Sequence, residues 1–69
     1  MNNYAIVIER ANGNYSAYVP DVPGCIATGK TIEETRRRLI DALESHLELM
    51  RKTGEPIPQP STLTEYIQV

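Results

Sequence analysis

The sequence predicts an α+β fold in which a three-stranded antiparallel meander is followed by one long helix and a C-terminal strand, in the order β-β-β-α-β. Residues 4–10 are rich in β-branched side chains and precede Asn12-Gly13, the strongest short signal for a two-residue hairpin turn. Residues 32–52 repeat apolar side chains at helical spacing. Residues 62–69 indicate a last strand, which a right-handed crossover would lay parallel to the first.

The hairpin turn determines the register of the first two strands, and with it the two faces of the sheet. The facing pairs that it predicts are Ala11 and Asn14, Arg10 and Tyr15, Ile8 and Ala17, and Ile6 and Val19. One face is mostly apolar and is the natural seat for the helix; it carries Tyr4, Ile6, Ile8, Ala17 and Val19. The other face is half apolar and carries Ala5, Val7 and Tyr18 beside Glu9 and Ser16.

Prolines and glycines shape the segment between the second strand and the helix. Because Pro20 and Pro23 lack a backbone N–H, the chain cannot continue a regular ladder between them. Gly24 permits a positive φ at the end of this turn, and residues 25–28 then form a short third strand. Gly29 turns the chain into the helix.

The helix is predicted to begin at a capping box and to end at a glycine. Thr31 can cap the first turn while Glu34 reaches back to it, and Gly54 ends the helix before residues 56–60, in which proline alternates. The apolar arc covers about 200°, wider than the roughly 100° stripe that one sheet needs, so we expect a further surface to contact it. Its members are Ile32, Leu39, Leu43, His46, Leu47 and Met50, flanked by Ile40, Ala42 and Leu49.

Length and composition limit the possible classes of protein. The 69 residues make one predicted domain, 1–69. A domain this small buries only about 60% of its unfolded surface, so we expect it to form a dimer or larger homo-oligomer or to bind a partner. The single cysteine excludes an internal disulfide. One histidine and one cysteine make no zinc set, so the sequence predicts no metal and no cofactor.

Charge and hydropathy limit the possible partners and the cellular location of the protein. The net charge of −2 argues against a general nucleic-acid binder and suits a basic protein partner. The sequence contains no apolar run long enough to span a membrane and no visible secretory signal. These features predict a cytoplasmic protein that does not bind membranes.

Few residues are candidates for chemistry, and each has a plainer interpretation. His46 lies on the apolar side of the helix, as a packed or interface histidine does. Cys25 starts a strand with no assigned base and is interpreted as a small buried residue. Residues 36–38 are arginines that point in different directions, as on a solvated helix face. Asp21 is either a turn residue or a fixed contact for a basic partner. The sequence therefore does not predict an enzyme.

The central motif also resembles a known family. Residues 18–25, Tyr-Val-Pro-Asp-Val-Pro-Gly-Cys, followed by Ala27-Thr-Gly29, Thr31 and Glu33-Glu34, resemble the core of the HicB-like antitoxins. Residues 54–60 are similar to the proline-rich segment that follows the helix in that family, so the resemblance covers nearly the whole chain. Two positions depart from the usual pattern: Lys30, where an acidic residue is common, and Thr35, where alanine is common.

The resemblance implies a partial ribonuclease H-like fold and a non-catalytic antitoxin that sterically covers a HicA-like, mRNA-cleaving toxin. Residues 5–8 carry no carboxylate where the ribonuclease H fold places its first metal ligand, so nuclease activity by that route is not expected. Many relatives add a DNA-binding module at the C-terminus, and the 69 residues leave no room for one, so we expect no autonomous DNA binding.

Two sets of contact residues are predicted, and one alternative function stays open. Expected to bind a partner are Tyr18, Asp21, Val22 and Pro23. Expected at an oligomer interface are Val7, His46, Leu47, Leu49, Met50 and Tyr66. The alternative is a solitary, self-assembling HicB-like domain with a ligand- or RNA-binding role unrelated to a toxin.

Overall fold

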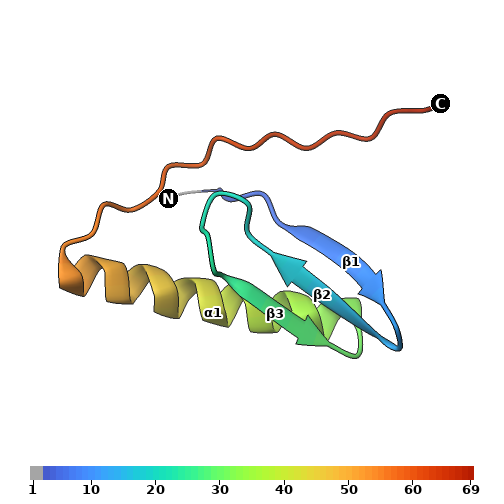
Figure 1. Cartoon of the computed structure of the whole chain (residues 1–69), viewed down its shortest axis with the longest axis horizontal. Coiled ribbons are helices and arrows are strands. Elements are labelled where there is room, and N and C mark those ends of the chain that lie inside the picture. The colour runs from blue at the N-terminus through green and yellow to red at the C-terminus, as the bar shows by residue number, and fades with distance from the viewer. Residues whose placement is uncertain (1–2) are drawn as a thin grey trace.

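The computed structural model describes residues 3–69, which form one antiparallel sheet with one helix across it (Figure 1). The elements are β1 (Val7–Ala11), β2 (Asn14–Tyr18), β3 (Ile26–Gly29) and α1 (Ile32–Thr53). The strand order is β1-β2-β3, so β2 is central and the other two strands are edges. The α+β class, the meander and the long helix are confirmed.

The predicted hairpin register is confirmed along the ladder that forms. Ile8 faces Ala17 and Arg10 faces Tyr15, around a turn in which Gly13 has a φ of 77°. The first strand is shorter than predicted, because it begins at Val7 rather than at residue 4. Its partner β2 ends at Tyr18: the next N–H, from Val19, is donated to the Cys25 carbonyl instead. The predicted pair of Ile6 and Val19 therefore lies beyond the ladder.

Residues 19–25 leave the ladder and form two consecutive turns, as the two prolines predict. The Val22 N–H donates to the Val19 carbonyl at 3.0 Å, and the Cys25 N–H donates to the Val22 carbonyl at 3.2 Å. Gly24 adopts a φ of 85°, which suits glycine. The third strand consequently begins at Ile26, one residue later than predicted.

Both ends of α1 are capped by the predicted residues, with one difference in the N-terminal cap. The Glu34 N–H donates to Thr31 Oγ1 at 3.0 Å, whereas the Glu34 carboxylate accepts from the Lys30 N–H at 2.9 Å rather than from Thr31. At the other end Gly54 has a φ of 76°, and its N–H and that of Glu55 donate to carbonyls of the last turn. This is the Schellman arrangement, which satisfies carbonyls that a helix end leaves free.

The core lies between α1 and one face of the sheet. Its fully buried apolar residues are Ala17, Val19, Val22, Cys25 and Leu39. Thr35 is also fully buried and satisfies its hydroxyl by donating to the Thr31 carbonyl at 2.7 Å. Gly29 faces this threonine so closely that a Cβ would lie 2.7 Å from Thr35 Oγ1. The glycine therefore lets the end of β3 approach the first turn of α1.

The predicted C-terminal strand is wrong for this structure: residues 62–69 are extended but belong to no sheet. They run past the β1 edge of the sheet, and the chain ends at an exposed Val69 (Figure 1). The predicted β-β-β-α-β order is thus β-β-β-α in residues 3–69, followed by an extended segment. Asp21 binds Ser61 and Thr62 at the start of the segment, and within residues 3–69 no backbone hydrogen bond joins the residues that follow to β1.

Candidate partner-binding surface

The side of the sheet that faces away from α1 exposes an apolar row across all three strands. Ile8, Ala17 and Ala27 face the core, so their sequence neighbours point the other way. The register aligns Val7 with Tyr18 and Tyr18 with Ile26 on that open face. Tyr18 is 39% exposed and Ile26 is 69% exposed. We call Val7, Tyr18 and Ile26 the apolar row.

A polar row lies beside the apolar row on the same face. Glu9 faces Ser16, and Ser16 faces Thr28, so one carboxylate and two hydroxyls border the exposed apolar side chains. An apolar patch with a polar border is typical of a protein-binding surface. The half-apolar character of this face was predicted from the first hairpin, but Ile26 was missed. The position of Ile26 on this face depends on the pairing of β2 with β3, and no short turn motif in the sequence predicts the register of that pair.

The predicted partner-binding residues lie at different depths. Tyr18 is part of the apolar row, and Pro23 is exposed in the loop that follows β2. Val22 is 1% exposed and packs in the core, so its side chain anchors the loop instead of facing a partner. Pro20 and Pro23 predict a turn at this place, but they do not indicate that the Val22 side chain is buried.

Asp21 is occupied within the chain itself. Its carboxylate accepts from the backbone N–H groups of Ser61 at 3.0 Å and Thr62 at 3.1 Å. It also accepts from the hydroxyl of Ser61 at 3.0 Å and from that of Thr62 at 2.8 Å. The Ser61 N–H foremost, then the Thr62 hydroxyl, lowers the pKa of Asp21 from 3.8 to about 2. The carboxylate therefore fastens the C-terminal segment to the loop after β2.

The predicted oligomer-interface residues fall into two groups. His46, Leu47 and Met50 are half-buried on α1, and Leu49 is 60% exposed on the same helix. Val7 lies across the sheet from α1, and it borders Tyr66 in a cleft of about 240 Å³ between β1 and the C-terminal segment. The structure thus brings Val7 and Tyr66 together but separates them from the helix residues.

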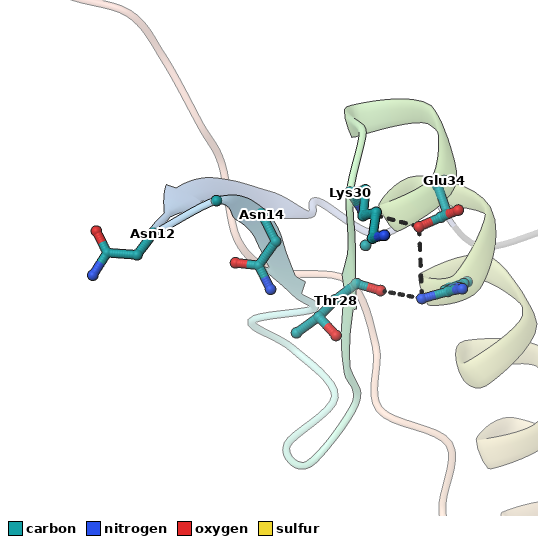
Figure 2. Close-up of a pocket in the computed structure, with 8 residues that line it drawn as sticks. Asn12, Asn14, Thr28, Lys30 and Glu34 are labelled. Carbon is teal, nitrogen blue, oxygen red and sulfur yellow. Dashed lines mark hydrogen bonds and ion pairs between the residues drawn. The ribbon is translucent and has the colours of Figure 1, made fainter.

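A polar pocket of about 580 Å³ lies between the β1–β2 turn and the start of α1 (Figure 2). Two of its charged side chains pair with each other: Arg38 Nη1 donates to the Thr28 carbonyl at 3.0 Å and lies 3.7 Å from Glu34 Oε1. The Lys30 N–H foremost, then Arg38, lowers the pKa of Glu34. These contacts join α1 to the end of β3, and we interpret the pocket as structural.

Other chemistry has little support within residues 3–69. In this range no three His, Cys, Asp or Glu side chains group as a metal site would need. Burial raises the pKa of the Cys25 thiol, which disfavours the thiolate that a nucleophile requires. The helix of the described chain is not long and apolar enough to cross a membrane.

A small α+β domain that exposes an apolar sheet face and an extended apolar segment has the form of a protein-binding module. Comparison with known families gives the particular class. The HicB-like antitoxins of bacterial toxin–antitoxin systems match residues 4–69, and the chain belongs to this family. The resemblance seen in the sequence is thereby confirmed, and members of this family are typically non-catalytic.

Relatives of this chain occur in phage and archaea. It is 38% identical over 64 residues to an uncharacterized 14.9 kDa protein from the rep-hol intergenic region of Haemophilus phage HP1. That match covers 93% of this chain but 48% of the phage protein, so the chain spans about half the length of this relative. A UPF0150 protein of Thermoplasma acidophilum is 33% identical over 57 residues, which cover 81% of this chain and 83% of the relative.

Two solved structures share the fold. The N-terminal domain of the Burkholderia pseudomallei antitoxin HicB is 30% identical with a TM-score of 0.75, and the match covers 83% of this chain and 69% of that one. A chain of a HicA3 and HicB3 toxin–antitoxin complex is 29% identical with a TM-score of 0.72, covering 86% of this chain and 69% of that one. The second structure contains a toxin together with its antitoxin.

Proposed function

We propose that this chain is an antitoxin that neutralises a HicA-like, mRNA-cleaving toxin by covering its catalytic and RNA-binding surface, without catalysing a reaction itself. The observation that carries the proposal is membership of the HicB-like antitoxin family over residues 4–69. The likeness to a chain from a HicA3 and HicB3 complex supports a partner of the same kind. A toxin that cleaves mRNA acts where mRNA is translated, so the proposal places the chain in the cytoplasm.

The apolar row is the surface that we propose for the toxin. Tyr18 lies at its centre between Val7 and Ile26, and a partly exposed tyrosine is a typical anchor of a protein interface. Glu9 lies in the adjacent polar row and adds negative charge. A surface that binds RNA is basic, so the Glu9 carboxylate would complement it and help to steer the encounter.

Growth rescue and co-purification test this proposal directly. The product of the adjacent open reading frame, tested as the toxin, is co-expressed with the wild-type chain or with Ile26→Lys, which places a charge in the apolar row. Ile40→Lys is the matched control, because Ile40 is 48% exposed on α1, on the other side of the sheet. We expect the wild type and Ile40→Lys to restore growth, and Ile26→Lys to weaken toxin binding about tenfold or more.

Three outcomes would contradict parts of the proposal. If the wild-type chain neither restores growth nor binds the toxin, the antitoxin role is wrong. If Ile40→Lys abolishes binding while Ile26→Lys does not, α1 and not the open sheet face contacts the toxin. If the purified chain alone cleaves RNA with Mg²⁺ or Mn²⁺ in proportion to its concentration, the non-catalytic assignment is wrong.

A further inference from the structure

The C-terminal segment, residues 62–69, alternates side chains as a β-strand does. In extended backbone the odd-numbered side chains point to one side and the even-numbered ones to the other. The first side carries Leu63, Glu65, Ile67 and Val69, and the second carries Thr64, Tyr66 and Gln68. The large apolar side chains of the segment are almost fully exposed: Leu63 is 90% exposed, Ile67 80%, and Tyr66 and Val69 fully. A cluster of solvent-exposed, large apolar side chains on one short segment indicates a surface that is buried when the protein binds another molecule.

The outer edge of β1 offers a complementary surface. As an edge strand, β1 pairs only with β2 in the described part of the chain, so backbone N–H and C=O groups on its other side have no strand to bond. The helix lies mainly over β3 and β2 and contacts β1 least. Ile6 and Ile8 consequently stay half-buried on the side of the sheet that α1 covers.

Two contacts hold the start of the segment beside this edge. Asp21 binds the backbone and hydroxyl groups of Ser61 and Thr62, and the Tyr4 hydroxyl donates to the Pro58 carbonyl. The segment then runs in the same sense as β1 (Figure 1). Between them lies the cleft lined by Ile6, Val7, Ile8, Thr64, Glu65 and Tyr66. Within residues 3–69 no backbone hydrogen bond joins the segment to β1.

We propose that two copies of this chain exchange residues 62–69, each segment pairing as a strand with the β1 edge of the other copy. Every copy carries both the unpaired edge and the unpaired segment, so a twofold arrangement satisfies both at once. A single chain brings the two side by side without pairing them, which is why the proposal assigns the edge to a second copy. Eight extended residues span about 26 Å, enough to cover a five-residue strand.

The side-chain pattern of the segment fits this place. A strand added to β1 continues both faces of the sheet. Leu63, Ile67 and Val69 would extend the side on which Ile6 and Ile8 are half-buried, with Glu65 as the one charged side chain among them. Tyr66 would then lie on the open face, next to the apolar row. A shift by one residue would reverse these sides, so the pattern excludes registers that differ by an odd number of residues.

Cysteine cross-linking distinguishes exchange from pairing within one chain. Val7→Cys is made in one chain and Tyr66→Cys in another, because both residues line the same cleft. When the two chains are mixed and oxidised, only a contact between copies can link position 7 to position 66. We expect a covalent heterodimer on a non-reducing gel. The wild type is the blank, since its single cysteine, Cys25, is buried.

A matched pair of charge variants tests the same exchange in solution. Ile67→Glu and Gln68→Glu add the same charge at adjacent positions, but only position 67 would face the side of Ile6 and Ile8. Light scattering at micromolar concentration should give twice the mass of one chain for the wild type and Gln68→Glu, and the mass of one chain for Ile67→Glu. Both positions lie in the exposed segment and outside α1, so the helical signal in circular dichroism should stay that of the wild type.

Other results would overturn the exchange. A wild-type chain that is monomeric in solution would overturn it. So would a double variant, Val7→Cys with Tyr66→Cys, that forms a disulfide within one chain while the mixed single variants form no cross-link. The latter would assign the segment to its own β1. A dimer that survives Ile67→Glu and gives no cross-link would place the interface elsewhere, for example on α1. None of these results depends on a toxin, so they leave the proposed antitoxin function to its own test.

Discussion

Gly29 and Asp21 illustrate how much single positions contribute to this small fold. Gly29 ends β3 where it meets the first turn of α1, and its lack of a side chain allows that contact. Asp21 joins the loop after β2 to residues that follow it by 40 positions or more. Each of the two residues determines how two segments meet.

Replacing Gly29 with alanine should destabilise the domain. The new Cβ would lie 2.7 Å from Thr35 Oγ1 and 2.9 Å from Thr35 N, so the strand and helix would have to separate. We expect a loss of about 1–3 kcal/mol in the free energy of unfolding, measured by urea denaturation. Because Thr35→Ala removes Oγ1 but not N, the double variant should recover part of the loss. Additive effects would contradict this contact.

The low pKa of Asp21 predicts a pH dependence of the C-terminal segment. A carboxyl whose pKa falls from 3.8 to about 2 on folding favours the folded contact above pH 4. That contribution is lost as the pH falls from about 4 to 2. NMR should show the amide protons of Ser61 and Thr62 titrating together with a midpoint near 2. Asp21→Asn should abolish this titration, and a midpoint of 3.8 would show that the contact does not form in solution.

At the scale of elements, α1 owes its position to its caps and to one narrow buried stripe. Thr35 and Leu39 are its fully buried residues, and Ala42 and Leu43 pack beside them against the core. The other apolar side chains of the predicted arc stay half-buried or exposed. The sheet therefore covers only part of the apolar arc of α1, as expected from the width of that arc in the sequence.

The N-terminal cap should contribute measurably to stability. Thr31→Ala removes the oxygen that accepts from the Glu34 N–H, and we expect a loss of about 1 kcal/mol by thermal or urea denaturation. Thr31→Ser keeps the oxygen and should stay within a few tenths of a kcal/mol of the wild type. Equal losses for both variants would show that the methyl group, and not the cap, is responsible.

The buried stripe of α1 can be tested with two leucines. Leu39 is 1% exposed, so Leu39→Ala should cost about 2–5 kcal/mol and unfold much of a domain this small. Leu49 is 60% exposed, and Leu49→Ala should change stability by less than about 0.5 kcal/mol. Circular dichroism during denaturation measures both. A large loss for Leu49→Ala would instead indicate that this residue lies in an interface.

At the scale of the whole molecule, the chain leaves two apolar surfaces open, and the two proposals assign them to different partners. The apolar row is assigned to a toxin, and the edge of β1 with residues 62–69 is assigned to a second copy. The two surfaces adjoin at Val7, which is half-buried in the row and also lines the cleft beside the C-terminal segment. A dimer formed by exchange would therefore enlarge the face proposed for the toxin.

Strand exchange makes stability depend on protein concentration, because dimerisation stabilises only the folded chain. We expect the melting temperature of the wild type to rise when the concentration increases a hundredfold from the micromolar range. Ile67→Glu should melt at one temperature throughout. Differential scanning fluorimetry with an external dye is suitable, since the sequence has no tryptophan. A wild-type melting temperature independent of concentration would argue against any dimer.

Local signals in the sequence were sufficient to predict most of the fold. Asn12-Gly13 determined the register of the first hairpin, Thr31 and Gly54 marked the helix ends, and residues 20–23 marked the break after β2. Each signal depends on residues within about five positions of one another, because the hydrogen bonds and backbone angles that define a turn or a helix cap lie within a short stretch of chain. The family resemblance rested on the same short motifs.

Only the tertiary structure decided the contacts between distant segments. The sequence alone favoured a strand at residues 62–69 and left Asp21 open as a partner contact, but packing brought Asp21 to Ser61 and Thr62, and the strand did not pair. Ile26 joined the apolar row for a similar reason. Backbone propensity describes what a segment can form by itself, whereas an edge, a core and a hydrogen-bond partner forty residues away exist only after the chain has folded.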